Sequence, residues 1–253
     1  MSNMRKYVAE ALGTMVLVVL GCGTAMTVGC SYSFGGGYVL TALAFGLALM
    51  AMAYTIGNIS GCHINPAVSF ATYLCGKMTL RDFIKYVIAQ IVGGFAGTGL
   101  LALVFILGKK TDLTGKVTAT GLQGDYLGFG ANGLAGVGNS SIAGLVVEIV
   151  LTFIFVLLVL TVCSKKTNAA VSGLVVGLGL TVVHILGIGL TGTSVNPARS
   201  IGPAVVAAIT GNPNTLSCLW IFVVGPMLGA VLAAFAFRLL ISPKTPKEIA
   251  YDE

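Results

Sequence analysis

The chain has 253 residues, of which 56% are hydrophobic and 9% are charged, and its mean hydropathy is +0.97. Soluble domains carry roughly 25% charged residues, so this composition excludes an ordinary soluble protein and predicts a polytopic protein embedded in a lipid bilayer. The formal charge of +6 is not gathered into a basic cluster that would suit nucleic acid, so no nucleic-acid partner is predicted.

Six apolar runs are each long enough to cross the roughly 30 Å hydrocarbon core of a bilayer as a helix. They cover residues 7–28, 38–57, 83–107, 142–163, 171–190 and 218–241. The first run follows Arg5 and Lys6, as the apolar part of a signal peptide would, but it has no evident cleavage site and further spans follow it. It is therefore interpreted as a retained helix.

Lysine and arginine divide unequally between the two sides of these spans. The side of both termini has Arg5, Lys6, Lys77, Arg81, Lys85, Lys165, Lys166, Arg238, Lys244 and Lys247. The opposite side has Lys109, Lys110 and Lys116, all in the connection 109–141. Because cations gather in cytoplasmic loops, we predict a multi-pass protein of the cell membrane with both termini in the cytoplasm.

The six cysteines, at positions 22, 30, 62, 75, 163 and 218, do not follow a metal-ligand or disulfide spacing. Most lie in apolar runs, where a thiol behaves as a small hydrophobe. No nucleophile–base set is present, and the two histidines are not paired by spacing. We therefore predict no metal, no cofactor and no enzymatic activity.

Three markers occur twice in the same order, at offsets of 138, 131 and 136 residues. They are Glu10–Thr14 with Glu148–Thr152, Gly46 with Gly177, and Gln90–Gly93 with Pro226–Gly229. Each copy contains three spans, an odd number, so the second copy enters the membrane upside down as an inverted repeat. The predicted organisation is a first repeat 1–108, an extracellular connecting loop 109–141, a second repeat 142–241 and a cytoplasmic tail 242–253.

Each copy also contains a shorter apolar segment that begins with Asn-Pro-Ala, at Asn65-Pro66-Ala67 and at Asn196-Pro197-Ala198. Asn is a favoured helix N-cap, and Pro is favoured at the first helical position. A helix over 65–75 would be about 16 Å long, which is half a membrane. We predict half-helices at 65–75 and 196–207, and hence an all-α membrane fold of six transmembrane helices plus two re-entrant half-helices.

The residues that lead into the half-helices, 60–64 and 191–195, are irregular and cannot face lipid, where each unpaired peptide group costs several kcal/mol. They are expected to line a water-filled cavity in which the two helix N-termini meet near the midplane. Each Asn would cap its helix and offer its amide to the cavity, while the positive helix ends would oppose a cation. The carbonyls expected along the path belong to Gly61, Cys62, His63, Gly192, Thr193 and Ser194.

The segments "HINPAV" and "SVNPARS" match the signature boxes of the major intrinsic protein family, the aquaporins and glycerol facilitators. The chain resembles this family over roughly residues 5–241. The resemblance implies a passive channel, driven by osmotic gradients, with water as permeant and protons and ions excluded. It also implies a homotetramer with four independent pores.

The family builds its constriction from four positions, which the resemblance assigns to Phe45, His184, Thr193 and Arg199. This set is similar to that of the bacterial water-selective members, the aquaporin Z type. Glycerol-conducting relatives typically have Gly at the histidine position, an aromatic residue in the loop and Asp after the arginine. Here Ser200 follows Arg199 and no aromatic residue lies between 191 and 196, so the resemblance favours water.

Several of these residues also have a purely structural interpretation. Phe45 alone would suit packing or a lipid-facing site, and His184 would suit a helix–helix hydrogen bond, although an ionisable group within a span indicates function by default. His63 suits either the lumen or the anchoring of its loop. Cys62, the repeat-mate of Thr193, is either a pore thiol that mercury compounds reach or a buried, unreactive one.

Glu10 and Glu148 are candidates for a proton relay, but the resemblance favours a structural role in which each carboxylate binds the backbone of one half-helix loop. Whether these two acids can couple transport to an ion helps to separate a water channel from the alternative functions. The nearest alternative is a facilitator of glycerol, ammonia or another small neutral solute. The other is an ion-coupled secondary transporter, since inverted repeats with broken helices also occur in that class, and these two acids are the only membrane-embedded carboxylates available for coupling.

Overall fold

A computed structural model of the chain describes residues 2–28, 36–108, 128–164 and 170–240. Within these ranges the regular secondary structure is helical and includes no strand, which confirms the predicted all-α class. Cys30, the predicted tail 242–253 and most of the predicted connection 109–141 lie outside the described residues.

Six helices are long and apolar enough to cross a bilayer, as the sequence predicts. They are α1 (Ser2–Val28), α2 (Gly36–Ser60), α4 (Leu80–Leu107), α5 (Ser141–Val162), α6 (Ser172–Thr191) and α9 (Ile221–Leu240). The first two and α4 begin two to five residues before the predicted apolar runs because their first turns are polar or Gly-rich but still helical. The last span is divided, since the short helix α8 (Asn214–Ser217) and a turn precede α9.

The two half-helices are α3 (Pro66–Leu74) and α7 (Pro197–Ile209), with Asn65 and Asn196 as their N-caps. The side-chain oxygen of Asn65 accepts the backbone N–H of Ala67 at 2.8 Å, and that of Asn196 accepts the backbone N–H of Ala198 at 3.1 Å. The starts therefore lie where the capping chemistry predicts them. α7 continues two residues past the predicted end at 207, because no local stop precedes Gly211, whose φ is 113°.

Equivalent helices of the two repeats pack in the same way. Gly93 of α4 crosses α1 so closely that a Cβ on it would lie 2.2 Å from the carbonyl oxygen of Ala11. Gly229 of α9 crosses α5 in the same manner, with a Cβ position 2.6 Å from the carbonyl oxygen of Ile149. Close approach of membrane helices needs such small residues, and both repeats place the glycine at the corresponding crossing.

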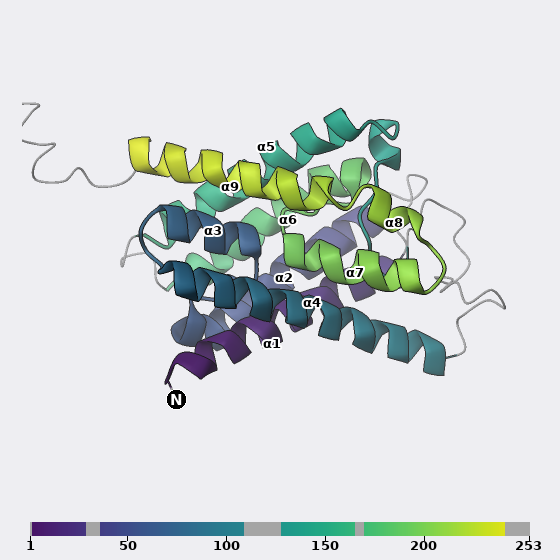
Figure 1. Cartoon of the computed structure of the whole chain (residues 1–253), viewed down its shortest axis with the longest axis horizontal. Coiled ribbons are helices and arrows are strands. Elements are labelled where there is room, and N and C mark those ends of the chain that lie inside the picture. The colour runs from purple at the N-terminus through teal and green to yellow at the C-terminus, as the bar shows by residue number, and fades with distance from the viewer. Residues whose placement is uncertain (1, 29–35, 109–127, 165–169, 241–253) are drawn as a thin grey trace, which may run out of the picture.

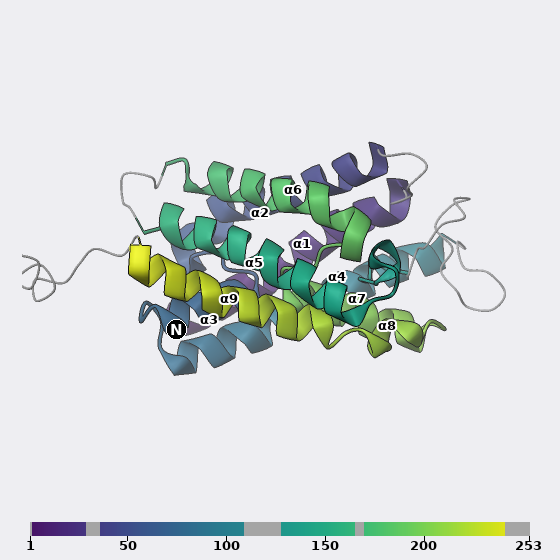
Figure 2. The same ribbon diagram turned by 90° about the horizontal axis from the view of Figure 1, so that it is seen from above.

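Helices α2 and α6, which belong to different repeats, cross at two repeat-mates. A Cβ on Gly46 would lie 2.5 Å from the carbonyl oxygen of Gly177, and a Cβ on Gly177 would lie 2.7 Å from the carbonyl oxygen of Gly46. Figure 2 shows the two helices side by side along one edge of the molecule. Equivalent residues that touch reciprocally must lie near the axis that relates the two repeats.

The two half-helices approach each other from opposite ends of the bundle. In Figure 1, α1 begins and α9 ends at the left end, α3 lies toward that end, and α7 lies toward the other. Their N-termini face each other near the middle of the molecule. This arrangement places the two Asn-Pro-Ala segments at one central site.

The distribution of apolar and polar side chains is the reverse of that in a soluble protein. Large apolar residues face outward on the long helices, as Leu103, Val182 and Phe235 do with exposed fractions of 51%, 65% and 66%. The acidic residues Glu10 and Glu148 are fully buried. An apolar exterior around a polar interior suits a lipid environment, and the chain is a multi-pass membrane protein.

Candidate functional site

The two half-helix N-termini are joined by a reciprocal pair of hydrogen bonds. The Asn65 side-chain amide donates to the carbonyl oxygen of Val195 at 2.7 Å, and the Asn196 amide donates to that of Ile64 at 2.9 Å. An amide has two N–H groups, so one of each pair binds the opposite loop and one remains for the cavity. The sequence argument, which gave the whole amide to the cavity, missed this link between the repeats.

The two lead-in segments, residues 60–64 and 191–195, have the same unusual backbone. In the first, Cys62 and Ile64 have φ values of 50° and 42°; in the second, Thr193 and Val195 both have 45°. Positive φ is rare for β-branched residues, and such strain of about 1–3 kcal/mol per residue persists only where the surroundings hold it in place.

Two buried carboxylates hold these strained segments. Glu10 accepts the backbone N–H groups of His63 at 2.9 Å and Ile64 at 2.6 Å. Glu148 accepts those of Ser194 and Val195, both at 2.9 Å. The geometry gives each acid the same task in its own repeat, namely to satisfy two peptide groups that no helix or strand can pair.

The side chains around the two carboxylates differ between the repeats. Glu10 also accepts the Gln90 amide at 2.7 Å, and Gln90 donates to Ser69, whose hydroxyl lies 3.1 Å from Nδ1 of His63. In the second repeat, Glu148 instead accepts the hydroxyl of Thr191 at 2.7 Å.

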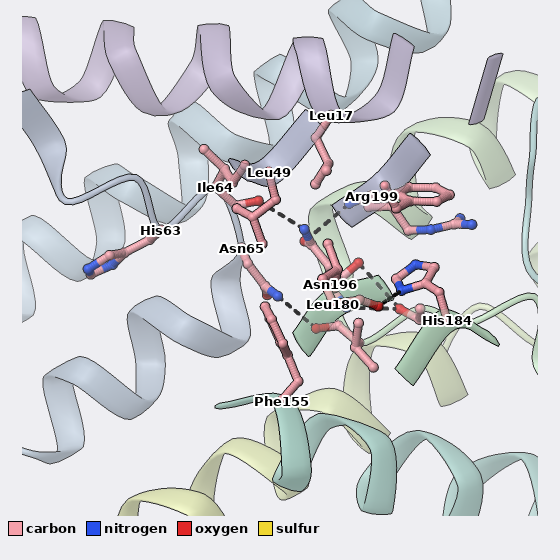
Figure 3. A pocket seen from close by; sticks show the side chains of 13 residues that line it. Leu17, Leu49, His63, Ile64, Asn65, Phe155, Leu180, His184, Asn196 and Arg199 are labelled. Carbon is pink, nitrogen blue, oxygen red and sulfur yellow. Dashed lines mark hydrogen bonds between the residues drawn. The ribbon is translucent and has the colours of Figure 1, made fainter. Parts of the chain in front are cut away.

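A narrow cavity surrounds the two N-caps (Figure 3). The free space inside it is large enough to hold a water molecule. Both polar loop residues and apolar helix residues line it: Leu17, Phe45, Leu49, His63, Ile64, Asn65, Phe155, Leu180, His184, Ser194, Val195, Asn196 and Arg199.

Three of the four predicted constriction residues meet at one end of this cavity. The rings of Phe45 and His184 stack with centroids 4.5 Å apart, and the Arg199 guanidinium carbon lies 5.0 Å from the Phe45 centroid. Nδ1 of His184 lies 2.9 Å from the carbonyl oxygen of Leu180 and must donate to it, which leaves Nε2 of a neutral ring as an acceptor. Among the described residues, neither this Nε2 nor Nε of Arg199 has a hydrogen-bond partner, and both atoms are buried.

Arg199 is buried without a carboxylate partner in the described ranges and is held by oxygen acceptors instead. Its guanidinium donates to the carbonyl of Gly130 and the side-chain oxygen of Asn132, both at 2.9 Å, and to the carbonyl of Gly192 at 3.2 Å. Asn132 also accepts the hydroxyl of Ser200 at 2.7 Å and donates to the carbonyl of Thr191 at 3.2 Å. One loop residue thus ties the arginine to its own half-helix.

Sequence reasoning missed Gly130 and Asn132 because they lie in the Gly-rich connection. The signal that could have found them is the arginine itself. A guanidinium in an apolar span needs several acceptors, and the connection contains polar side chains, Asn132 among them, that could supply one.

Thr193 and Cys62 lie behind the lining of the cavity. The Thr193 side chain is fully buried, and its hydroxyl lies so close to Gly187 of α6 that a Cβ there would be 2.4 Å away. Cys62 is 8% exposed, and its backbone N–H donates to the hydroxyl of Ser60 at 3.1 Å. Neither side chain lines the cavity, and Gly61 and Gly192 do not line it either. His63 lines the cavity and also contacts Ser69, so it combines the lumen-facing and the loop-anchoring positions considered from the sequence.

No group of three or more His, Cys, Asp or Glu side chains within the described ranges could hold a metal ion. What the geometry offers is a set of donors and acceptors at fixed positions along a narrow cavity.

Comparisons with known proteins agree with this description. Residues 1–237 match the family described as major intrinsic protein (MIP). The chain is 38% identical over 238 residues to Aquaporin Z of Brucella melitensis biotype 1, covering 94% of this chain and 98% of the relative. It is 37% identical over 243 residues to Aquaporin Z of Rhodopseudomonas palustris, covering 94% of each. The X-ray structure of the aquaglyceroporin from Plasmodium falciparum superposes with a TM-score of 0.79 at 25% identity, covering 95% of this chain and 98% of that one.

Proposed function

Because this chain belongs to the major intrinsic protein family, whose members are channels rather than enzymes, we propose that it is a passive, water-selective channel driven by osmotic gradients. The observation that carries the proposal is the ring of Phe45, His184 and Arg199 at one end of the cavity. Its two unpartnered nitrogens supply one acceptor, on His184, and one donor, on Arg199. Water can use both, whereas the stacked rings leave little apolar wall for the carbon backbone of a larger solute.

Protons and ions are excluded at the centre of the pore. The N-termini of α3 and α7 meet there, and each helix end is equivalent to about half a positive charge. The free N–H of Asn65 and that of Asn196 would each hold the oxygen of a passing water molecule. Such a molecule cannot accept a proton from a neighbour while its lone pairs are engaged, and a cation meets two positive helix ends.

We further propose that the lead-in segments supply the acceptors along the path through their carbonyls, from Gly61, Cys62 and His63 on one side and Gly192, Thr193 and Ser194 on the other. Thr193 would contribute through its backbone, since its hydroxyl faces α6. Glu10 and Glu148 keep the segments in this conformation.

The main alternative is a facilitator of glycerol or another small neutral solute. The superposition on the Plasmodium falciparum aquaglyceroporin favours it, since the fold is shared with a protein of that name. The identity to two proteins named Aquaporin Z favours water. An ion-coupled transporter is disfavoured, because the oxygens of both buried carboxylates already accept hydrogen bonds from backbone N–H groups and other side chains.

We propose that the protein lies in the cell membrane with both termini in the cytoplasm and assembles as a homotetramer. The unequal distribution of lysine and arginine supports the orientation. Family membership supports the tetramer.

The test is stopped-flow light scattering on proteoliposomes that contain the purified protein, with water efflux and glycerol uptake measured on the same preparation. We expect water efflux well above that of empty liposomes, with a low activation energy, and glycerol uptake close to background. The His184→Gly variant removes one wall of the ring and should admit glycerol at a measurable rate. Rapid glycerol uptake by the unmodified protein would establish the facilitator, and uptake that requires an ion gradient would establish the transporter.

A further inference from the structure

The last carbonyl groups of α2 and α6 occupy equivalent positions in the two repeats. They belong to Ser60 and Thr191, which are separated by the same 131 residues as the two N-cap asparagines. In each case the next residue is a glycine with positive φ, Gly61 at 84° and Gly192 at 74°, so the helix stops there. A carbonyl at the end of a helix has no partner within that helix, and a buried one needs a donor from elsewhere.

The two repeats supply this donor from different parts of the chain. In the second repeat the carbonyl accepts the side-chain amide of Asn132 and the backbone N–H of Gly133, both at 3.2 Å. In the first repeat the Ser60 carbonyl accepts the hydroxyl of Tyr86 on α4 at 2.7 Å. The repeat-mate of Tyr86 on α9, 136 residues later, is Phe222, which has no hydroxyl. The first repeat therefore uses one buried phenol where the second uses the connecting loop.

Tyr86 also packs against a residue that lines the cavity. It is 3% exposed, and its ring lies 5.3 Å, centroid to centroid, from that of His63, with an interplanar angle of 60°. Figure 3 shows the His63 ring pointing away from Asn65. One side chain thus binds the start of the first lead-in segment through its hydroxyl and contacts the histidine of the same segment through its ring.

A series of contacts joins Tyr86 to the end of the bundle where α1 and α4 begin (Figure 1). The ring of Tyr7 on α1 meets that of Tyr86 edge-on, with centroids 5.9 Å apart. The Tyr7 hydroxyl donates to a carboxylate oxygen of Asp82 at 2.7 Å, and the same oxygen lies 2.9 Å from Nζ of Lys6. Nζ of Lys85 lies 5.1 Å from the Tyr7 ring centroid. Side chains of both helices therefore hold Tyr7, which in turn supports the ring of Tyr86.

Building on the function proposed above, we propose that Tyr86 is a positioning residue for water conduction. Its hydroxyl and its ring fix the first lead-in segment, whose carbonyls are the acceptors along the path, and the contacts of Tyr7 with Asp82 support it from the end of the bundle. Tyr86 does not line the cavity, so it acts through this segment. Because glycerol is excluded at the Phe45–His184–Arg199 ring, loss of the Tyr86 contacts should slow water without admitting glycerol.

The variant Tyr86→Phe removes the hydroxyl and keeps the ring. We expect stopped-flow water efflux at equal protein content to fall about fivefold, which corresponds to about 1 kcal/mol of barrier, while glycerol uptake stays at background. Tyr73→Phe is the matched control, since Tyr73 on α3 contacts Phe70 and Phe83 through its ring, and it should conduct like the unmodified protein. Unchanged water efflux through Tyr86→Phe would overturn the proposal, as would an equal fall in Tyr73→Phe.

A second readout does not depend on transport. The chain contains two histidines, so NMR spectra of protein with isotope-labelled histidine report on each imidazole separately. Tyr86→Leu removes the ring and should shift the signals of His63, whereas those of His184 on α6 should stay in place. A shift of both histidines, or of neither, would overturn the proposal. If the unmodified protein carries no water above empty liposomes although the His63 signals respond, the function proposed for the whole channel fails instead.

Discussion

The two lead-in segments, 60–64 and 191–195, have nearly the same backbone and different surroundings. Both contain a left-handed glycine followed by positive φ at the same two later positions, and both donate two N–H groups to a buried glutamate. Around the first lie Gln90 and Ser69; around the second lie Arg199, Asn132 and Ser200. The two segments therefore share one backbone conformation, whereas the side chains around them differ.

The largest loss of stability is expected at the two buried glutamates, because both repeats use one to hold the lead-in segment. Glu10→Ala and Glu148→Ala each leave two buried backbone N–H groups unpaired, at about 1–3 kcal/mol per group, or roughly 2–6 kcal/mol in total. We expect both variants to lose thermal stability by similar amounts in detergent, as measured by a melting curve. A Gln at either position keeps one acceptor oxygen and should lose less. A large difference between the two alanine variants would break the equivalence of the halves.

The next largest effect is expected on glycerol uptake when Arg199, which has no charged counterpart in the first repeat, is replaced. Arg199→Val gives the second half-helix the residue that its repeat-mate Val68 has in the first. Removal of the guanidinium widens the ring and deletes its strongest donor, so we expect water efflux to persist while glycerol uptake rises by at least tenfold, or about 1.4 kcal/mol of barrier. Unchanged glycerol exclusion in the stopped-flow assay would mean that selectivity lies elsewhere.

A smaller effect is expected at the loop that holds the arginine. Asn132→Ala removes one acceptor of Arg199 and one of Ser200. A hydrogen bond to a charged group contributes about 1.5–3 kcal/mol, and the carbonyls of Gly130 and Gly192 remain as acceptors. We therefore expect a several-fold rise in glycerol uptake, weaker than that of Arg199→Val. Asn132→Asp keeps the acceptor and should stay selective. Full exclusion in Asn132→Ala would indicate that the two carbonyls suffice.

The smallest effects are expected at Ser69 and Ser200, which occupy equivalent positions in the two repeats. Ser69 contacts His63 and Gln90, whereas Ser200 contacts Ser194 and Asn132. Each serine-to-alanine change should cost about 0.5–1.5 kcal/mol of stability per hydrogen bond lost. Only Ser200→Ala should also raise glycerol uptake, since only Ser200 reaches the support of Arg199. Equal leakage in both variants would show that the two networks are not specialised.

The sequence could predict whatever depends on local chemistry. Asn65 and Asn196 mark the starts of α3 and α7 because an N-cap followed by proline has one favoured conformation. The spans follow from apolar length, and the repeat follows from the offsets of Glu10 and Glu148. The end of α7 was predicted less well. The helix continues to Ile209, just before the turn at Gly211, and the sequence alone does not show where in this region the helix stops.

What the sequence could not predict depends on contacts between distant segments. The bonds from Asn65 to Val195 and from Asn196 to Ile64 join residues 130 and 132 positions apart. Their donors were recognised, but their acceptors are backbone oxygens, which carry no residue-specific signal. Asn132 was missed for a related reason, since it lies in a Gly-rich loop without periodicity and gains its role only when Arg199 is placed beside it.

The central claim is that the two lead-in segments share a backbone conformation, but that only the side chains around the second decide which solutes pass. It is tested most directly by glycerol uptake into proteoliposomes that contain either His184→Gly or His63→Gly, the two histidines that line the cavity, with water efflux recorded as the measure of intact channels. We predict measurable glycerol uptake through His184→Gly and none above background through His63→Gly, with fast water efflux in both. Equal glycerol uptake through the two variants would contradict the account.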